Sequence, residues 1–408
     1  MRMGRMLGST VLVIAAAGLT LSAADWPQWR GPRRDGIAAE TGLLKSWPAE
    51  GPPLVWRAAG AGNGYSSFAV AGNRLYTMGA KGNQELLLAY DTATGKPVWE
   101  TPIGARLEQD RGDGPRGTPT VDGTRVYSIT GRGDLSCVDA ATGKKVWNVS
   151  FTSAFSSSIP NWGFSESPLV VGDRVIANAG GLDASIVAFN KTNGEVLWKS
   201  GSDRAAYSSG VLHEANGMRQ AIFFTAENAL GVNVSDGRIL WTYDKANNRT
   251  ANISTPVIRG DRVFISSDYG TGGGLLQLSP AGGGVSAKEV YFTREMRTHH
   301  NTAVLIGDHM YGFSSAILTA MKFDDGAVAW RDRSVGKGSL VSAEGQLYLY
   351  SENGVVGLAD AAPEGYRERG RFTLKAGSLP TWTHPVVSGG RLYLRDQDTI
   401  YAYDVRAK

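Results

Sequence analysis

Cysteine is almost absent from this sequence, since Cys137 is the single one in 408 residues. That scarcity excludes a disulfide framework and a cysteine-rich zinc or iron–sulfur site. An excess of one charge is also missing, because 42 Lys and Arg stand against 38 Asp and Glu, for a net charge of +4. A balance this even excludes a protein that binds nucleic acid through a basic surface. No long helical period of apolar residues is found either, which favours an all-β fold.

The first residues predict export. Arg2 and Arg5 form a positive start, Leu7–Leu21 is an apolar run, and Ser22–Ala24 supplies the small residues of a cleavage site. This pattern is typical of a cleaved secretory signal peptide, Met1–Ala24. The alternative, a membrane anchor, needs about 20 apolar residues, which is more than this run contains. No cysteine follows to carry a lipid. We therefore expect a periplasmic or secreted protein with no integral membrane segment after cleavage.

A short motif recurs along the rest of the chain. Its copy at Thr255–Phe264 consists of two short apolar runs around Gly260-Asp261, and such a pair of residues favours a tight hairpin turn between two strands. Four clear copies and four weaker ones make eight, and they begin at Thr118, Ser167, Thr255, His384, Ser66, Ser209, Thr302 and Ser339.

Each copy continues with a third strand, a turn and a fourth strand that carries an aromatic residue. Over Leu54–Val405, eight copies correspond to about 44 residues each, and a four-stranded propeller blade needs about 40–45. We therefore predict an eight-bladed β-propeller of four-stranded antiparallel blades. The aromatic residues of the fourth strands are Trp56, Trp99, Trp147, Trp198, Trp241, Tyr291, Trp330 and Phe372.

The two ends of the repeat region are each incomplete. Leu54–Trp56 is a fourth strand without its blade, and His384–Val405 is a blade without its fourth strand. We expect the two to pair and close the ring, because closure removes a free sheet edge. The predicted organisation is a signal peptide at 1–24, a lead-in segment at 25–53 that packs across the ring, and the propeller at 54–405.

The repeat resembles the pyrroloquinoline-quinone-type (PQQ-like) propeller repeat. The residues that carry the resemblance are the Asp-x-x-Thr-Gly-Lys-x-x-Trp runs at Asp91–Trp99 and Asp139–Trp147, a near match at Asn190–Trp198, and the opening run Asp25–Pro32. The resemblance covers about Asp25–Arg406. Proteins with this repeat include quinoprotein dehydrogenases, BamB-type outer-membrane assembly lipoproteins and many exported propellers, so the resemblance implies the fold more strongly than an activity.

The chain departs from both of these families. Quinoprotein alcohol dehydrogenases usually carry a vicinal cysteine pair over the cofactor, and their calcium ligands are Glu, Asn and Asp. This chain has one cysteine and no motif that places such a calcium set. BamB-type proteins carry a lipidated cysteine after the signal, which is missing here. The resemblance therefore assigns no role to an individual residue.

The loops that precede the innermost strands should meet at one mouth of the central channel. The residues there are aromatic or hydrogen-bonding, as a site for a small molecule or a peptide requires. The alternative is that these side chains fill the channel and bond to one another. The predicted rim consists of Asn63, Tyr65, Arg116, Trp162, Phe164, Glu166, Tyr207, Asn252, Arg297, His299, His300, Lys337, Trp382 and His384.

Three histidines and a glutamate of this rim suggest other chemistry. His299, His300, His384 and Glu166 are residue types that bind zinc, and a histidine there could act as a general base. Adjacent residues on a strand point to opposite faces, so at most one of His299 and His300 is expected to face the channel unless the backbone bulges there. We therefore predict neutral, hydrogen-bonding histidines and no metal.

The primary hypothesis is a binding or scaffold module that catalyses nothing and holds a small molecule or a protein segment at the channel mouth. Its catalytic residues are accordingly unknown and it needs no cofactor. The alternative is a quinoprotein dehydrogenase of alcohols or sugars, with PQQ stacked on Trp162 or Trp382 and calcium beside it. For that alternative the rim offers Glu166, Asn252 and Lys337 as partners.

Overall fold

The structure is a computed structural model in which residues 25–374 and 377–407 are described. Within these ranges the chain forms 33 β-strands and one short α-helix, which confirms the all-β class. In the same residues, no helix combines the length and the apolar character needed to span a membrane. The predicted signal peptide, Met1–Ala24, lies outside the described residues.

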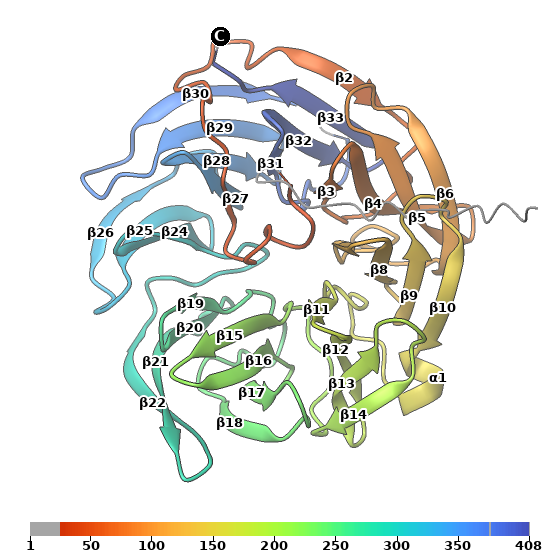
Figure 1. The fold of residues 1–408 in the computed structure, drawn as a ribbon. Coiled ribbons are helices and arrows are strands. Elements are labelled where there is room, and N and C mark those ends of the chain that lie inside the picture. Colours follow the sequence, from red (N-terminus) through yellow and green to blue (C-terminus); the bar gives the residue numbers. More distant parts are fainter. Residues whose placement is uncertain (1–24, 375–376, 408) are drawn as a thin grey trace, which may run out of the picture.

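Eight sheets, each built on four antiparallel strands, stand around a central axis as the blades of a propeller (Figure 1). The predicted number and type of blades are confirmed. The first blade consists of β3 (Ala69–Ala71), β4 (Arg74–Lys81), β5 (Gln84–Asp91) and β6 (Pro97–Ala105), and the second of β7 (Thr120–Asp122), β8 (Arg125–Ile129), β9 (Asp134–Asp139) and β10 (Lys145–Ser150). The third consists of β11 (Leu169–Val171), β12 (Arg174–Gly181), β13 (Ala184–Asn190) and β14 (Val196–Ser200). The fourth consists of β15 (Val211–Ala215), β16 (Met218–Phe224), β17 (Ala229–Asn233) and β18 (Ile239–Tyr243).

The remaining blades follow the same order along the chain, and the helix α1 (Phe151–Phe155) lies after β10. The fifth blade consists of β19 (Val257–Arg259), β20 (Arg262–Ser267), β21 (Gly272–Ala281) and β22 (Gly284–Thr293), and the sixth of β23 (Val304–Ile306), β24 (His309–Ser314), β25 (Ile317–Lys322) and β26 (Val328–Asp332). The seventh consists of β27 (Gly338–Ala343), β28 (Gln346–Ser351), β29 (Val355–Asp360) and β30 (Glu368–Thr373). The eighth consists of β31 (Val386–Ser388), β32 (Arg391–Asp396), β33 (Thr399–Asp404) and β2 (Leu54–Ala58).

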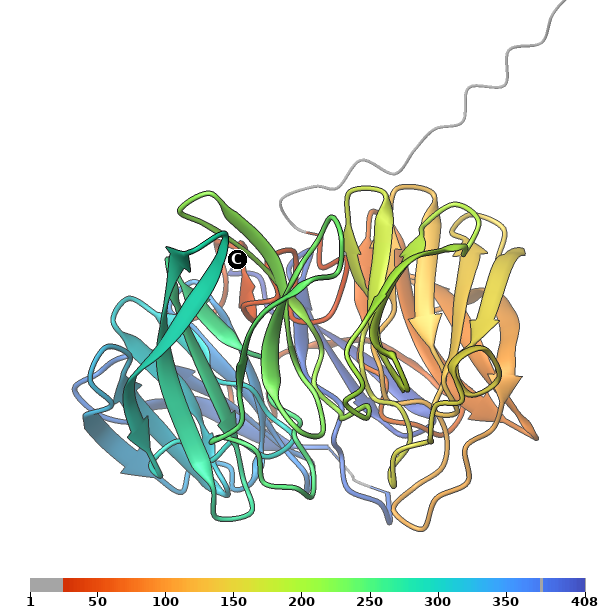
Figure 2. The ribbon, with the colours of Figure 1, turned by 90° about the horizontal axis from the view of Figure 1, so that it is seen from below.

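The strand that starts each repeat lies nearest the axis, and the fourth strand lies at the periphery (Figure 1). The loop before the first strand and the turn between the second and third strands are therefore at the same end of the axis, here called the mouth face. The turn between the third and fourth strands is at the opposite end, the back face. Figure 2 views the ring from the side, with the lead-in segment toward its upper edge.

Strand β2, the first strand of the propeller region, closes the ring as predicted. It pairs antiparallel with β33, with Leu54 opposite Tyr403 and Ala58 opposite Ile400. The last blade therefore takes its peripheral strand from the start of the propeller and its other three strands from the end. This pairing hydrogen-bonds the two ends of the propeller to each other.

The lead-in segment crosses the ring near the axis, where the first coloured residues run in Figure 1. Its short strand β1 (Ile37–Ala38) pairs in parallel with the innermost strand β27, which gives the seventh blade a fifth strand that the repeat did not predict. Trp26 forms an isolated bridge to Val70 at the first blade. The segment thus packs across the ring, in agreement with the sequence-based expectation.

The aromatic residues of the fourth strands connect neighbouring blades. The Trp198 Nε1–H donates to the carbonyl oxygen of Val234 in the next blade at 3.0 Å, and Trp99 makes the same contact to Ala140 at 3.1 Å. Gly237 lies over the Trp198 ring with φ +77°, and an added Cβ would stand 2.5 Å from that ring. The Gly of the repeat is thus required both by its positive φ and by the aromatic residue of the preceding blade.

Apolar side chains pack mainly between blades. One cluster of buried residues, for example, joins Ile176 and Trp198 of the third blade to Phe223 and Leu230 of the fourth. Cys137 on β9 is fully buried in a similar cluster, as expected for a small apolar residue. The core is therefore a ring of layers between blades, and it leaves the axis to polar loops.

Candidate functional site

A cavity of about 330 Å³ lies at the mouth face, around the axis. Its walls come from the loops before the innermost strands of several blades, so residues far apart in the sequence meet there. Nine of the fourteen residues predicted for the rim line this cavity: Tyr65, Arg116, Trp162, Tyr207, His299, His300, Lys337, Trp382 and His384.

The other five predicted residues do not line the cavity. Asn63 is exposed and its backbone forms a bridge to Ala80. Phe164 is buried and packs against Phe151, with ring centroids 5.6 Å apart. Arg297 is tied through its backbone N–H to the Ser314 hydroxyl at 3.0 Å. The remaining two are Glu166 and Asn252, which are described below.

Eight further residues complete the lining, and the sequence-based interpretation missed them. Trp29 comes from the lead-in segment, and Tyr269 comes from the turn between β20 and β21, which lies at the mouth face. A signal for Tyr269 was present, because that turn is at the same end of the blade as the predicted loops. The eight are Trp29, Arg111, Ser165, Ser209, Ala251, Ile253, Tyr269 and Thr302.

Aromatic rings form two walls of the cavity. The rings of Tyr65 and Trp382 are tilted against each other with centroids 5.0 Å apart, and those of Trp162 and Tyr207 are 5.7 Å apart. The two rings within each pair contact each other, as expected if these side chains filled the channel. A cavity nevertheless remains beside them. Aromatic walls of this kind favour a flat apolar or aromatic group.

The lead-in segment forms the floor of the cavity. The Trp29 ring packs edge-on against His384 with centroids 4.5 Å apart, and its N–H donates to the Thr255 hydroxyl at 2.8 Å. The buried Arg30 and Arg34 follow this tryptophan in the sequence. Arg30 donates to the carbonyl of Thr302 at 2.9 Å, and Arg34 donates to those of Ser167 and Gly210 at 3.1 and 2.7 Å. The floor is therefore fixed to the ends of three innermost strands.

Both His299 and His300 line the cavity, which matches the exception expected for an irregular backbone and not the alternation of a regular strand. The reason is that the two residues lie in a bend rather than in a strand, and the alternation of an extended chain does not apply. Their Nδ1 atoms are 3.3 Å apart, and His299 Nε2 is 3.1 Å from the Tyr269 hydroxyl.

Burial keeps these histidines neutral. It lowers the pKa of His299 to about 4, aided by Lys337, and the pKa of His384 to about 3. The pKa of His300 lies well below its usual range, because of burial and then of His299. His300 Nε2 and His384 Nδ1 are buried atoms without a hydrogen-bond partner among the described residues. Each of these atoms therefore has unused hydrogen-bonding capacity in the folded chain.

Positive charge gathers at the rim. The Arg116 guanidinium lies 5.5 Å from the Tyr65 ring centroid and donates to the Gly112 carbonyl at 2.8 Å. Lys337 is 3.5 Å from the Glu352 carboxylate, which stands outside the lining, and Arg111 is exposed at the rim. Among the residues that the structure describes, no Asp or Glu lines the cavity.

The donors proposed for calcium and PQQ do not meet in the cavity. The Glu166 carboxylate is buried, where it accepts the Asn178 N–H at 2.7 Å, and burial raises its pKa to about 8 despite the nearby Arg34. The Asn252 amide donates to the Thr225 carbonyl at 2.8 Å. Calcium requires oxygen ligands, usually carboxylates, and the lining offers none, so these residues do not fit a calcium-bound quinone.

A metal site from the three histidines and Glu166 is not formed either. Glu166 is separated from the cavity by its own buried contacts, and the described residues contain no group of three or more His, Cys, Asp or Glu that could hold a metal ion.

Sequence comparisons identify relatives of one kind. The chain is 30% identical over 118 residues to the outer membrane protein assembly factor BamB of Burkholderia pseudomallei, covering 28% of this chain and 27% of that protein. It is 25% identical over 284 residues to the protein of the same name from Yersinia pestis, covering 63% and 65%. In both cases the match spans less than two thirds of the relative's own length.

Solved structures share the fold at lower identity. BamB from Moraxella catarrhalis has a TM-score of 0.62 at 14% identity, covering 86% of this chain and 99% of that one. A europium-containing methanol dehydrogenase has a TM-score of 0.68 at 11% identity, covering 91% and 89%. Likenesses at this level of identity establish the propeller and not an activity.

A family model described as outer membrane protein assembly factor BamB matches residues 107–332, which is more than half of the chain. The match covers the second to sixth blades, and the eight-bladed ring built on PQQ-like repeats agrees with it. The chain therefore belongs to this family.

Proposed function

We propose that this propeller is an exported binding module that acts outside the cytoplasm and holds its ligand in the mouth-face cavity, without catalysing a reaction. Its relatives bear the name of an outer membrane protein assembly factor, and a role in such assembly requires contacts with other proteins. The observation that carries the proposal is a preformed cavity with aromatic walls, a cationic rim and no lining carboxylate.

The lining favours an aromatic group that carries a negative charge. Tyr65, Trp382, Trp162 and Tyr207 offer ring faces, and the cations of the rim complement an anion.

The same histidines argue against catalysis. A general base works best when its pKa lies near the working pH. Burial places the pKa of His299 at about 4 and that of His384 at about 3, so both are weak bases at neutral pH. No lining residue is a carboxylate that could take their place within the described part of the chain.

The quinoprotein alternative makes a contrasting prediction. Purified protein mixed with PQQ and calcium would then show the absorbance of bound cofactor and would reduce a dye in the presence of an alcohol or a sugar. We expect neither, because the cavity lacks carboxylate ligands for calcium. Calcium-dependent dye reduction would replace the binding proposal with the dehydrogenase.

Photo-crosslinking tests the proposal directly. Tyr269 is half-exposed at the cavity, and Lys96 is exposed on the back face, in the turn between β5 and β6. A photoreactive phenylalanine analogue at each position, in the producing cells, should give adducts of defined mass at 269 and none at 96. The same result at both positions, or no adduct at 269, would remove the mouth-face cavity as the binding site.

A further inference from the structure

A second cavity, of about 260 Å³, adjoins the first on the mouth face. Tyr207 and Ala251 line both cavities, so the two are neighbours across a shared edge. The second cavity leads away from the axis, between loops of the third and fourth blades and the loop before the fifth. Each cavity alone lies near or below the lower end of the range of ligand sites, about 300–1,000 Å³.

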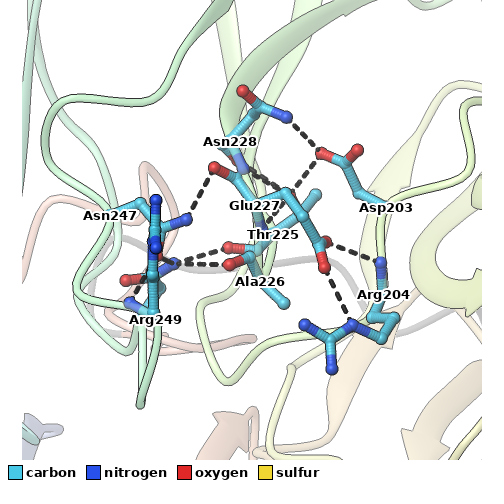
Figure 3. A network of polar contacts seen from close by, with 9 residues as sticks. Asp203, Arg204, Thr225, Ala226, Glu227, Asn228, Asn247 and Arg249 are labelled. Carbon is cyan, nitrogen blue, oxygen red and sulfur yellow. Dashed lines mark hydrogen bonds and ion pairs between the residues drawn. The ribbon is translucent and has the colours of Figure 1, made fainter.

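The walls of the second cavity are held by a network of polar contacts, which Figure 3 shows. The Asp203 carboxylate accepts from the Thr225 hydroxyl at 2.7 Å and from the Asn228 amide at 3.0 Å. The Glu227 carboxylate binds the Arg204 guanidinium at 2.8 Å. These contacts tie the loop before β15 to the turn between β16 and β17, so this wall is built before a ligand arrives.

Arg249, on the loop before β19, is the other arginine of this cavity. Its backbone has φ +60°, a conformation that a side-chain-bearing residue seldom adopts, and its N–H donates to the Asn247 side chain at 2.6 Å. The Asn252 amide donates to the same Asn247 oxygen at 3.1 Å. Asn252, predicted as a rim residue, therefore lies in the second cavity and supports the loop that presents Arg249.

Only one of the two arginines of the second cavity is paired with a carboxylate. Arg204 is neutralised by Glu227, whereas the exposed Arg249 guanidinium has no carboxylate partner within the described ranges. Arg111 and Arg116 at the first cavity also lack an ion pair there. Unpaired guanidinium groups therefore stand at both cavities, and the side chains between them, Tyr207 and Ala251, are uncharged.

We infer that the ligand is an extended acidic segment of a polypeptide, with an aromatic side chain in the first cavity and carboxylates at Arg111 and Arg249. This inference rests on the proposed function, because it specifies the ligand of the same site. An extended chain advances about 3.3 Å per residue and can follow two adjoining cavities, which a compact small molecule cannot. The unpaired arginines favour carboxylates on that chain.

Calorimetric titration of the full chain with defined probes tests the inference. The probes are the blocked peptide acetyl-Gly-Glu-Phe-Glu-Gly-Glu-Gly-amide, the same peptide with Lys in place of Glu, and phenylacetate as a small aromatic anion. The acidic peptide should bind and the lysine peptide should not. Arg249→Gln should weaken the acidic peptide about tenfold, the loss of one charge-assisted contact, and leave phenylacetate unchanged.

Two variants serve as comparisons. Arg111→Gln should weaken the peptide and phenylacetate alike, since it removes charge at the first cavity. Lys144→Gln removes the same charge from the exposed turn between β9 and β10 on the back face and should change neither.

The outcomes separate the inference from the proposed function. Binding of phenylacetate without the acidic peptide would overturn the inference and leave the cavity as a small-molecule site. Equal binding of the lysine peptide, or peptide binding that Arg249→Gln does not alter, would overturn the inference and leave the proposed function standing. Failure of every probe, together with no adduct at position 269, would overturn both.

Discussion

His384 is a residue whose chemistry is set by its place in the ring. It is buried on the floor of the cavity, one ring nitrogen lies 2.8 Å from the His300 carbonyl, and the other has no partner among the described residues. Burial lowers the pKa of His384 to about 3 in the folded chain, whereas a histidine of the unfolded chain binds a proton near pH 6.5. Between these two pH values His384 is therefore neutral in the folded chain and protonated in the unfolded chain.

This shift predicts acid sensitivity with a defined sign. Because the folded-state pKa is below the unfolded value, the unfolded chain binds the extra proton, and the free energy of unfolding falls as the pH drops from 6.5 toward 3. His384→Gln should remove up to about 1.4 kcal/mol per pH unit of that fall. Urea unfolding of both proteins, followed by tryptophan fluorescence at several pH values, measures it. If the free energy of unfolding fell equally with pH in the two proteins, His384 would not be the group that causes the acid sensitivity.

The fourth strands connect the ring at the scale of secondary-structure elements. Each brings an aromatic residue against the next blade, and most of these residues donate a hydrogen bond to a carbonyl there. Trp241 differs, since its Nε1–H donates to the Gln220 side chain within its own blade at 2.7 Å. The repeated tryptophan is therefore a structural link between blades and not a ligand platform.

Removing one such link should weaken the ring by a modest amount. Trp198→Phe keeps the ring face over Gly237 but loses the bond to the Val234 carbonyl. We expect a decrease in the free energy of unfolding of about 0.5–1.5 kcal/mol, measured by chemical denaturation. Trp198→Ala should lose about 3–5 kcal/mol, because it also creates a cavity. An unchanged midpoint for Trp198→Phe would mean that the carbonyl finds an equivalent donor.

The blades could be predicted from the sequence because their determinants repeat. A Gly turn, a third strand and an aromatic residue recur eight times, so the weak copies are supported by the strong ones. The cavity could be predicted only in part, because its residues lie outside the repeat. Trp29 belongs to the lead-in, which has no periodicity. Ser165 faces the cavity while its neighbours Phe164 and Glu166 are buried away from it, and this alternation could not be assigned without the loop's conformation.

At the scale of the whole molecule, the lead-in segment binds distant blades together. Arg34 is fully enclosed, and its guanidinium donates to carbonyls at the start of the third and fourth blades, while Arg30 donates at the start of the sixth. Burial lowers the pKa of each guanidinium to about 10, which leaves both charged at neutral pH. The lead-in segment therefore links three blades to one another and fixes the cavity floor.

Two adjacent arginines allow a matched test of this role. Arg34→Met would leave buried carbonyls without a donor and should lower the free energy of unfolding by about 3 kcal/mol or more. Arg33 is exposed and pairs with Asp35 at 2.7 Å, so Arg33→Met should change it by less than about 1 kcal/mol. Equal effects of the two substitutions, measured by denaturation, would contradict the structural role of the lead-in.

If ligands bind at the mouth face, in the cavity around the axis, its loops should become protected when a ligand is present. Hydrogen–deuterium exchange of the full chain, with and without the acidic peptide, measures this protection. We expect slower exchange in residues 106–117, 157–167, 203–209 and 244–255, whose loops line the two cavities, and no change in the turns of the back face. Protection on the back face or along the peripheral strands, with these loops unaffected, would contradict binding at the mouth face.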